Sequence, residues 1–346
     1  MQTNTGNNLV DPSPEALTEW LSGQGEKPFR AAQILRWLFR RGAESYLEMT
    51  DIRTDLRHEL AETFAVPRLK ILDTRVSADG SKKFLFGLRD GLSIESVLMY
   101  EKDHATLCVS SQVGCAQGCV FCRTGEMGFK RNLTSFEILA QVCGVRFSLE
   151  NPDHLTNIVF MGMGEPLANF DNVVTALNVL SEPTMGMKFA ARRITVSTVG
   201  LVPKIPALGR DTRARLAVSL NAADDETRTR LMPINRKYPI AELLESLRDF
   251  PLKTGKRITF EYVMLKGVND SMADARNLVR ILSHTPAKIN LIPFNPHEGS
   301  PFERPTDENV IAFREYLANK NFTAMVRYSK GLDVGAACGQ LASAGP

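Results

Sequence analysis

The chain has 346 residues, more than one typical domain but within the size of an α/β barrel that carries a small additional domain. Hydrophobic residues make up 43% and charged residues 23%, with no long uninterrupted apolar run, so the composition is that of a soluble globular protein and excludes a membrane span. A formal net charge of +3 is too small to indicate a nucleic-acid partner by itself.

Residues 1–8 are polar and contain neither a basic segment nor an apolar core. No secretory signal is therefore predicted, and we expect a cytoplasmic protein, a monomer, with no membrane partner. The cytoplasm keeps thiols reduced, so the six cysteines are expected to be free thiols or ligands.

Apolar residues recur at helical spacing in two stretches of the first 67 residues, one between Pro28 and Gly42 and the other between Asp51 and Pro67. The polar face of the first helix carries the arginines Arg30, Arg36, Arg40 and Arg41. We predict a helical accessory domain over 1–67 whose basic face contacts RNA; the alternative is a solvated face without a partner.

After these helical stretches, the spacing of the apolar residues changes to the alternation that is typical of β-strands. Alternating runs at 69–76, 83–88 and 92–99 are separated by two Asp-Gly dipeptides, which favour tight hairpin turns. They predict an antiparallel β-hairpin region over 68–104. Glu95 shares a strand face with Val97 and Met99, so its carboxylate is either an edge charge kept in water or a functional group.

From residue 105 to 346, short β-rich runs alternate with helical stretches. The runs are 106–110, 157–161, 193–198, 215–220, 257–263, 288–292 and 323–327. This alternation predicts an α/β fold, a partial or full (β/α) barrel of parallel strands with crossover helices.

Three cysteines, Cys115, Cys119 and Cys122, have a C-x3-C-x2-C spacing that gathers three thiolates on one loop. A [4Fe-4S] cluster normally takes four cysteines, so three ligands leave one iron free to hold a small molecule. This spacing is typical of the radical S-adenosylmethionine (radical SAM) enzymes. The alternative is a structural zinc site, whose fourth ligand would be His104, Cys108 or a distant residue.

Small polar residues follow several of the predicted strands. They are Gly164 and Glu165, Ser197, Ser219 and Asn221, and Asn295. Active sites of such barrels lie at the carboxyl ends of the strands, where these side chains would meet. We predict that they bind a ligand with amino-acid, ribose and adenine parts, although each residue alone is also common in turns.

Two further cysteines are candidates for covalent chemistry. Cys338 lies among small residues that permit a mobile loop, and Cys108 lies on the first barrel strand. A thiolate can act as a nucleophile, and two thiols can close a transient disulfide. The alternative is that both cysteines are buried and inert. Cys143 is expected to pack as a small hydrophobic residue.

Four segments carry a specific resemblance that extends over nearly the whole chain. They are CAQGCVFC at 115–122, GMGEPLAN at 162–169, LMPINRKYP at 231–239 and AACGQL at 336–341. With the N-terminal helices, they resemble the RlmN/Cfr family of radical SAM RNA methyltransferases.

The resemblance implies methylation of an adenine ring carbon with a [4Fe-4S] cluster, two SAM molecules per turnover and an electron donor for the cluster. It implies that Cys338 carries a methyl group, that Cys108 later forms a disulfide with Cys338, and that Glu95 accepts a proton. The SAM contacts that it implies are Gly164, Glu165, Ser197, Ser219, Leu220, Asn221 and Asn295. Many relatives have His at the position of Asn221.

The implied substrates are 23S rRNA and tRNA, modified at adenine C2 in the branch that the motifs favour. Such bases lie in loops from which one nucleotide can be extruded into a pocket. The alternatives are C8 methylation, as in the Cfr branch, a metal-containing RNA-binding protein without catalysis, and a radical SAM enzyme that acts on a small molecule or peptide.

Overall fold

The structure is a computed structural model and describes residues 9–252 and 255–342. The polar N-terminal segment 1–8, on which the prediction of no secretory signal depends, lies outside the described residues. No helix in the described ranges is both long and apolar enough to span a bilayer.

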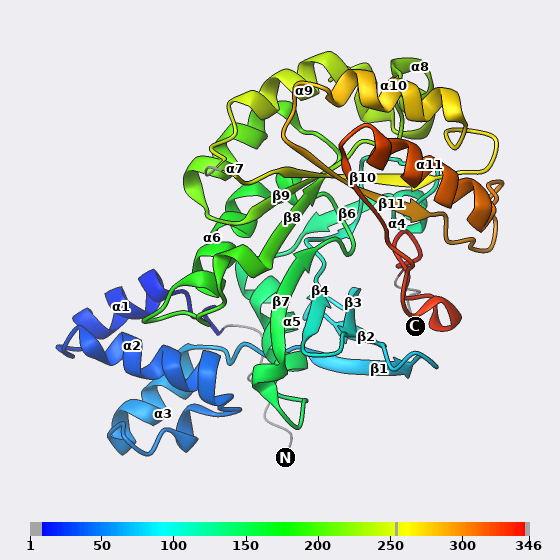
Figure 1. Cartoon of the computed structure of the whole chain (residues 1–346). Coiled ribbons are helices and arrows are strands. Elements are labelled where there is room, and N and C mark those ends of the chain that lie inside the picture. The colour runs from blue at the N-terminus through cyan, green and yellow to red at the C-terminus, as the bar shows by residue number, and fades with distance from the viewer. Residues whose placement is uncertain (1–8, 253–254, 343–346) are drawn as a thin grey trace.

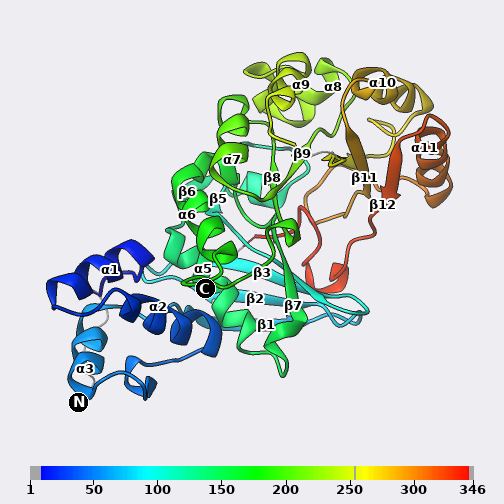
Figure 2. The same cartoon turned by 60° about the vertical axis from the view of Figure 1, so that its left-hand side comes forward.

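The first helices form a unit set to one side of the sheet, as Figures 1 and 2 both show. Its helices are α1 (Pro14–Gly23), α2 (Phe29–Arg36), a π-helical turn (Trp37–Arg41) and α3 (Thr54–Thr63). Ser13 caps α1 through its hydroxyl, and Gly42 ends the π-helical turn with a φ of 74° that favours glycine. The predicted helical stretches are therefore present, and their buried apolar side chains belong to the same hydrophobic cluster as those of the barrel.

Ten strands of the described residues form one sheet in the order β1-β2-β3-β4-β7-β8-β9-β10-β11-β12. The strands are β1 (Lys70–Val76), β2 (Lys82–Gly87), β3 (Ser93–Tyr100), β4 (Ala105–Cys108), β7 (Leu155–Phe160), β8 (Ile194–Thr198), β9 (Arg215–Ser219), β10 (Ile258–Met264), β11 (Ala287–Pro293) and β12 (Thr323–Val326). Pairing is antiparallel from β1 to β4 and parallel from β4 to β12.

The predicted α/β barrel is confirmed in its partial form. β4 pairs with β3 and β7, so β12 does not close the sheet onto β4 and the barrel stays open. The hairpin region β1–β3 extends the sheet at that side. The division at residues 67 and 104 stays a prediction, because the sheet runs without a break from the hairpins into the barrel.

Crossover helices cover the outer side of the curved sheet (Figure 1). They are α5 (Ser135–Arg146), α6 (Phe170–Ser181), α7 (Ile205–Asp211), α8 (Asp225–Leu231), α9 (Ile240–Arg248), α10 (Met272–Leu282) and α11 (Asp307–Asn319). Short 3-10 helices occur at Tyr46–Glu48, Pro152–His154, Pro166–Asn169, Ala191–Arg193, Val202–Lys204, Pro233–Arg236 and Leu332–Val334. Apolar side chains from helices and strands form the main core.

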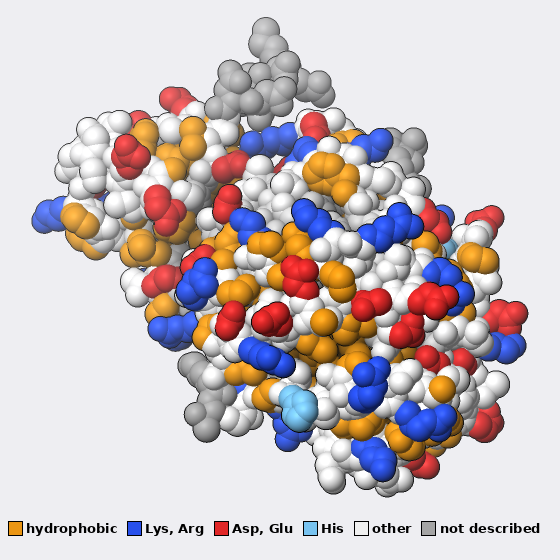
Figure 3. All heavy atoms as spheres, turned by 90° about the horizontal axis from the view of Figure 1, so that it is seen from above, with side chains coloured by type: hydrophobic (Ala, Val, Ile, Leu, Met, Phe, Trp, Pro, Cys, Tyr) orange, Lys and Arg blue, Asp and Glu red, His pale blue; other side chains and the backbone are white. Residues whose placement is uncertain are grey.

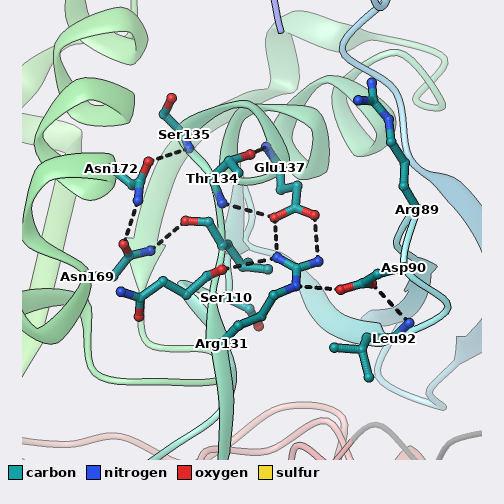
Figure 4. Close-up of polar contacts among 12 residues, drawn as sticks. Arg89, Asp90, Leu92, Ser110, Arg131, Thr134, Ser135, Glu137, Asn169 and Asn172 are labelled. Atoms are coloured by element: carbon teal, nitrogen blue, oxygen red, sulfur yellow. Dashed lines mark hydrogen bonds and ion pairs between the residues drawn. The ribbon is translucent and has the colours of Figure 1, made fainter. Parts of the chain in front are cut away.

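A two-stranded hairpin, β5 (Gln112–Gly114) and β6 (Phe129–Asn132), flanks the three-cysteine loop and the short helix α4 (Arg123–Glu126). Figure 4 shows how it is anchored: the Arg131 guanidinium donates to both carboxylate oxygens of Glu137 (2.8 and 2.9 Å) and to Asp90 (2.6 Å). Asn169 Nδ2 donates to the carbonyls of Ser111 and Leu133, so the hairpin is bonded to the barrel on two sides.

Candidate active site

The open barrel contains a larger cavity of about 720 Å³ and a smaller one of about 160 Å³, each lined by both polar and apolar side chains. Four residues line both cavities: Met161, Glu261, Ile292 and Cys338. The two spaces therefore meet at Cys338, a thiol placed where it can face a ligand on either side.

The three cysteines of the C-x3-C-x2-C loop all line the smaller cavity. The loop is tightly folded: Cys122 N donates to Cys119 O (3.1 Å), and a Cβ on Gly125 would lie 3.0 Å from the same oxygen. Loss of hydration by burial raises the pKa of Cys115 to about 11 and that of Cys119 well above its usual value. Such thiols ionise readily only beside a bound cation, so the donor set fits a metal cluster.

The zinc alternative finds no complete ligand set here. His104 and Cys108 line the larger cavity, whereas the three loop cysteines line the smaller one. Within residues 9–252 and 255–342, no group of three or more His, Cys, Asp or Glu side chains is arranged to hold a single metal ion. Neither His104 nor Cys108 therefore lies where it could complete a zinc site with the three loop cysteines.

Five of the predicted SAM contacts share the smaller cavity with the cysteines: Gly164, Glu165, Ser197, Ser219 and Asn221. Gly164 has a φ of 97°, and a Cβ there would meet Gln112 at 2.5 Å, so the backbone bends in a way that glycine alone allows without strain. Ser197 lies on β8 and Ser219 lies on the neighbouring strand β9. Their hydroxyl oxygens are 3.4 Å apart.

The other two predicted SAM contacts do not line that cavity. Leu220 has a fully buried side chain, and its carbonyl accepts from Arg228 Nε (3.1 Å). Asn295 Nδ2 donates to Cys338 O (3.0 Å), so this side chain holds the thiol loop in the structure. The amide of Asn221 is also engaged, because its Oδ1 accepts from Val263 N (2.8 Å).

Glu165 is the buried carboxylate of the smaller cavity, with 2% of its surface exposed. It accepts from Leu167 N (2.9 Å), Thr198 Oγ1 (2.7 Å) and Val199 N (2.9 Å). Desolvation by burial outweighs these bonds and raises the pKa of Glu165 to about 7. Two carboxylate oxygens offer about four acceptor positions, so room for one further donor remains.

The two candidate catalytic thiols face the larger cavity together. Cys108 lies on β4 opposite Val97, and Cys338 lies on the loop after β12. Burial, and then the nearby Cys338, raise the pKa of Cys108, whereas Cys338 itself is an exposed cysteine. Both are thiols at neutral pH and need deprotonation to act as nucleophiles.

The Cys338 loop is docked at several points. Arg123 N donates to Gly339 O (2.8 Å), Thr124 Oγ1 to Leu341 O (2.6 Å) and Gln340 Nε2 to Pro296 O (2.8 Å). These bonds tie the loop to the helix after the cluster cysteines and to the segment after β11. The mobility predicted for this loop stays a prediction, and the structure gives its docked position.

Glu95, the candidate proton acceptor, lines neither cavity. Its carboxylate forms an ion pair with Lys83 Nζ (3.0 Å) and accepts from Ala342 N (2.9 Å), and both side chains are buried. Lys83 Nζ also donates to Gly335 O (3.2 Å). In the docked state the pair therefore holds both ends of the C-terminal loop.

The basic helix predicted to contact RNA uses part of its charge internally. Arg40 donates to the carbonyls of Pro183, Thr184 and Gly186, and Arg41 lies over the Trp37 ring with Asp51 nearby. A second basic group, missed in the sequence, lines the larger cavity: Arg192, Arg193, Arg215, Lys288, Arg327 and Lys330. These residues lie at or near strand starts and in loops, where basic residues are ordinary.

Comparisons with known proteins identify the family of the chain. A family model described as "Ribosomal RNA large subunit methyltransferase N-terminal domain" matches residues 7–66, and one for the "Radical SAM superfamily" matches 109–279. The chain is 54% identical to "Dual-specificity RNA methyltransferase RlmN" of Desulfosudis oleivorans, over 94% of this chain and 88% of that protein. The chain belongs to the RlmN family of radical SAM methyltransferases.

Further relatives extend the match. The protein of the same name from Geobacter sulfurreducens is 53% identical over 95% of this chain and 90% of its own length. A crystal structure of a radical SAM methyltransferase from Sphaerobacter thermophilus superposes with a TM-score of 0.90 at 46% identity, covering 95% of this chain and 97% of that one. The resemblance inferred from the four segments is confirmed. Membership implies SAM and an iron–sulfur cluster as cofactors.

Glu165 predicts a pH dependence of SAM binding. If the carboxylate receives the ammonium group of SAM, protonation below a pKa of about 7 removes that acceptor, and affinity should fall by about fivefold from pH 7 to pH 6. Anaerobic calorimetric titration of reconstituted protein with SAM measures this. Glu165→Gln should bind more weakly and lose the pH slope; an equal slope in both proteins would assign it to another group.

Two functional candidates were missed in the sequence, Glu261 and Asn290, which lie side by side on β10 and β11. Glu261 is 7% exposed, and desolvation raises its pKa to about 7. The available signal was a carboxylate in the middle of the apolar run of Ile258–Met264, since buried acids are rare unless paired or functional.

Figure 3 shows acidic and basic side chains interspersed over the face seen from above. A nucleic-acid footprint is usually a patch of one sign, and this face has none. The basic residues that line the larger cavity are candidates for phosphate contacts near the thiols.

Proposed function

We propose that this chain is a dual-specificity RNA methyltransferase that adds a methyl group to C2 of an adenine in 23S rRNA and in tRNA. The observation that carries the proposal is the position of Cys338, which lines both the cavity of the cluster cysteines and the cavity of Cys108. The names of the relatives, about half identical over nearly the whole chain, support the RNA substrates.

In this proposal Cys115, Cys119 and Cys122 hold a [4Fe-4S] cluster, and the residues of the smaller cavity hold SAM, two molecules being used per turnover. When bound, cluster and SAM supply a methyl group and a 5'-deoxyadenosyl radical, chemistry that no side chain provides. The chain's part is to position the thiols and the base and to exclude water.

Cys338 takes the methyl group on its sulfur and, after loss of one hydrogen atom from that group, joins its carbon to the adenine. The new C–C bond leaves one unpaired electron on the adduct, for which a bound cluster would be the acceptor, and the proton of the ring carbon goes to Glu95. The Cys108 thiolate then attacks the sulfur of Cys338: an S–S bond forms, the S–C bond breaks with its electron pair left on the carbon, and that carbon takes a proton and leaves with the base as a methyl group. The disulfide must be reduced by an external thiol before the next turnover, and the cluster needs its own electron donor.

Glu95 is proposed to accept the proton lost from the ring carbon. Its two oxygens are occupied by Lys83 Nζ and Ala342 N in the docked state, so the C-terminal loop has to shift before this carboxylate can reach a substrate. An undocked loop would also carry Cys338 between its two partners. We also propose that the protein is a monomer and works in the cytoplasm, where thiols are kept reduced.

The test is to identify the modified nucleoside. Anaerobically reconstituted protein, SAM and a reductant should convert one adenosine in an rRNA fragment and one in a tRNA transcript into 2-methyladenosine, found by mass spectrometry against synthetic standards. 8-Methyladenosine would assign the C8 reaction instead. Binding of RNA without any methylated base would leave the non-catalytic alternative.

A further inference from the structure

Glu261 and Asn290 form a polar pair in the larger cavity. Their strands are parallel neighbours and the two residues are partners in the register, so their side chains project from the same face. Asn290 Nδ2 donates to Glu261 Oε1 (2.9 Å). With 7% and 9% of their surfaces exposed, both are buried among apolar strands.

The pair is incomplete as it stands. Asn290 Oδ1 is buried and has no hydrogen-bond partner among the described residues. Buried amide oxygens in proteins are nearly always paired, because an unpaired one loses its hydration without replacement. A buried acceptor without a partner, on a residue that lines a cavity, indicates a ligand that brings a donor.

The position of the pair shows which ligand enters there. Asn290 lines the larger cavity and not the smaller one, while Glu261 reaches the junction where Cys338 lies. Basic residues line the same larger cavity, which suits a base attached to phosphates. The ligand of this cavity is therefore the RNA base and not the adenine of SAM.

We propose that Asn290 and Glu261 read the Watson–Crick edge of the substrate adenine, with Asn290 Oδ1 accepting from the 6-amino group and Glu261, as a neutral acid, donating to N1. An amide is well matched to adenine, since it can accept from the amino group beside a ring nitrogen. The order amino group, N1, C2 around the ring then places C2 on the Glu261 side, toward Cys338. This assignment rests on the proposed function.

Its surroundings allow Glu261 to act as a neutral acid. Desolvation raises the pKa of Glu261 to about 7. The hydrogen bond from Asn290 and the positive charges of Arg327 and Lys288 lower this pKa, but their effect is smaller. Cys338 faces it from the C-terminal loop and is a neutral thiol. Both the donor and the acceptor that adenine requires are thus present near neutral pH.

The experiment pairs base analogues with variants. Stem-loop RNAs carry adenosine, purine riboside (no 6-amino group), 1-deazaadenosine (no N1) or 7-deazaadenosine at the target, and kcat/KM is measured with the holoenzyme. Wild type should lose about tenfold or more on the first two analogues beyond their intrinsic reactivity, and tolerate 7-deazaadenosine within about threefold. Loss on 7-deazaadenosine alone would mean that the other edge is read, and would overturn the proposal.

The variants separate recognition from folding. Asn290→Ala should lower kcat/KM on adenosine by about tenfold and remove the extra penalty on purine riboside, because the partner of the amino group is already gone. Glu261→Ala should do the same for 1-deazaadenosine, whereas Glu261→Gln, which still offers a donor, should keep most of the activity. Asn178→Ala, at an exposed position of α6, is the matched control and should behave as wild type.

Methylation of Cys338 by SAM without RNA, followed by intact-protein mass, is the second measurement. It should be unchanged in Asn290→Ala; an equal loss of this step and of RNA methylation would assign the pair to SAM binding or to folding and overturn the inference. Failure of the proposed function is recognised separately, since wild type would then make no methyladenosine in unmodified RNA.

Discussion

Replacing Cys119 by alanine is expected to abolish reductive cleavage of SAM. Cys119 is 9% exposed and lies between the two other cysteines of the loop, all three lining the smaller cavity. Two thiolates cannot hold a cluster that already lacks its fourth protein ligand. Production of 5'-deoxyadenosine should fall by more than about a hundredfold. Replacing a residue that only hydrogen-bonds to a metal ligand already lowers metal affinity or activity by about 10–100-fold.

The measurement is chromatography of 5'-deoxyadenosine, with iron and sulfide content determined on the same sample. Cys143→Ala is the matched control, because Cys143 is fully buried on α5 and packs in the main core. The control should keep its cluster and its activity. If Cys119→Ala made 5'-deoxyadenosine at the wild-type rate, the loop would not hold the cluster.

Replacing Cys108 by alanine is expected to trap the RNA on the protein. Cys108 and Cys338 face one cavity, and Cys338 is close enough to raise the pKa of Cys108. Without the Cys108 thiol, Cys338 can still be methylated and join the base, but nothing attacks its sulfur to release the product. A covalent protein–RNA species should therefore accumulate to about one RNA per active chain. Each chain can react only once, because the variant cannot release its product.

Labelled RNA on a denaturing gel shows the adduct, and digestion followed by mass spectrometry locates it at Cys338. The double variant with Cys338→Ala should form none, and Cys143→Ala should release its product normally. Free, fully methylated RNA at the wild-type rate from Cys108→Ala would remove the thiol-exchange step from the proposal.

Much of the fold was predictable because its signals are local. The hairpin turns at Asp79-Gly80 and Asp90-Gly91, and the seven β-rich runs after residue 105, correspond to strands of the described sheet within a few residues. Turn chemistry and strand patterning act over short stretches and need no distant partner. The open form of the barrel was not predictable, since closure depends on pairing between strands far apart in sequence.

The site was predictable only in part for the same reason. The SAM contact of Asn295 stays a prediction: its Nδ2 donates to the Cys338 carbonyl, because the C-terminal loop returns across the end of β11, while its buried Oδ1 has no partner among the described residues. The role of Glu95 as proton acceptor stays a prediction, because Lys83 of the neighbouring strand and Ala342 N occupy its carboxylate in the docked state. For both side chains the C-terminal loop, which is distant in sequence, supplies a partner: Cys338 O for Asn295 and Ala342 N for Glu95.

The sequence by itself determined the chemistry that this protein can support: three thiols at a cluster spacing, two spare cysteines, and strand-end residues suited to SAM. These depend on residue type and short spacing, which are local properties. Only the tertiary structure decided that Cys338 lies between two cavities and that Asn290 and Glu261 face the larger one. Strand register and loop docking bring those side chains together, and both arise from contacts between segments far apart along the chain.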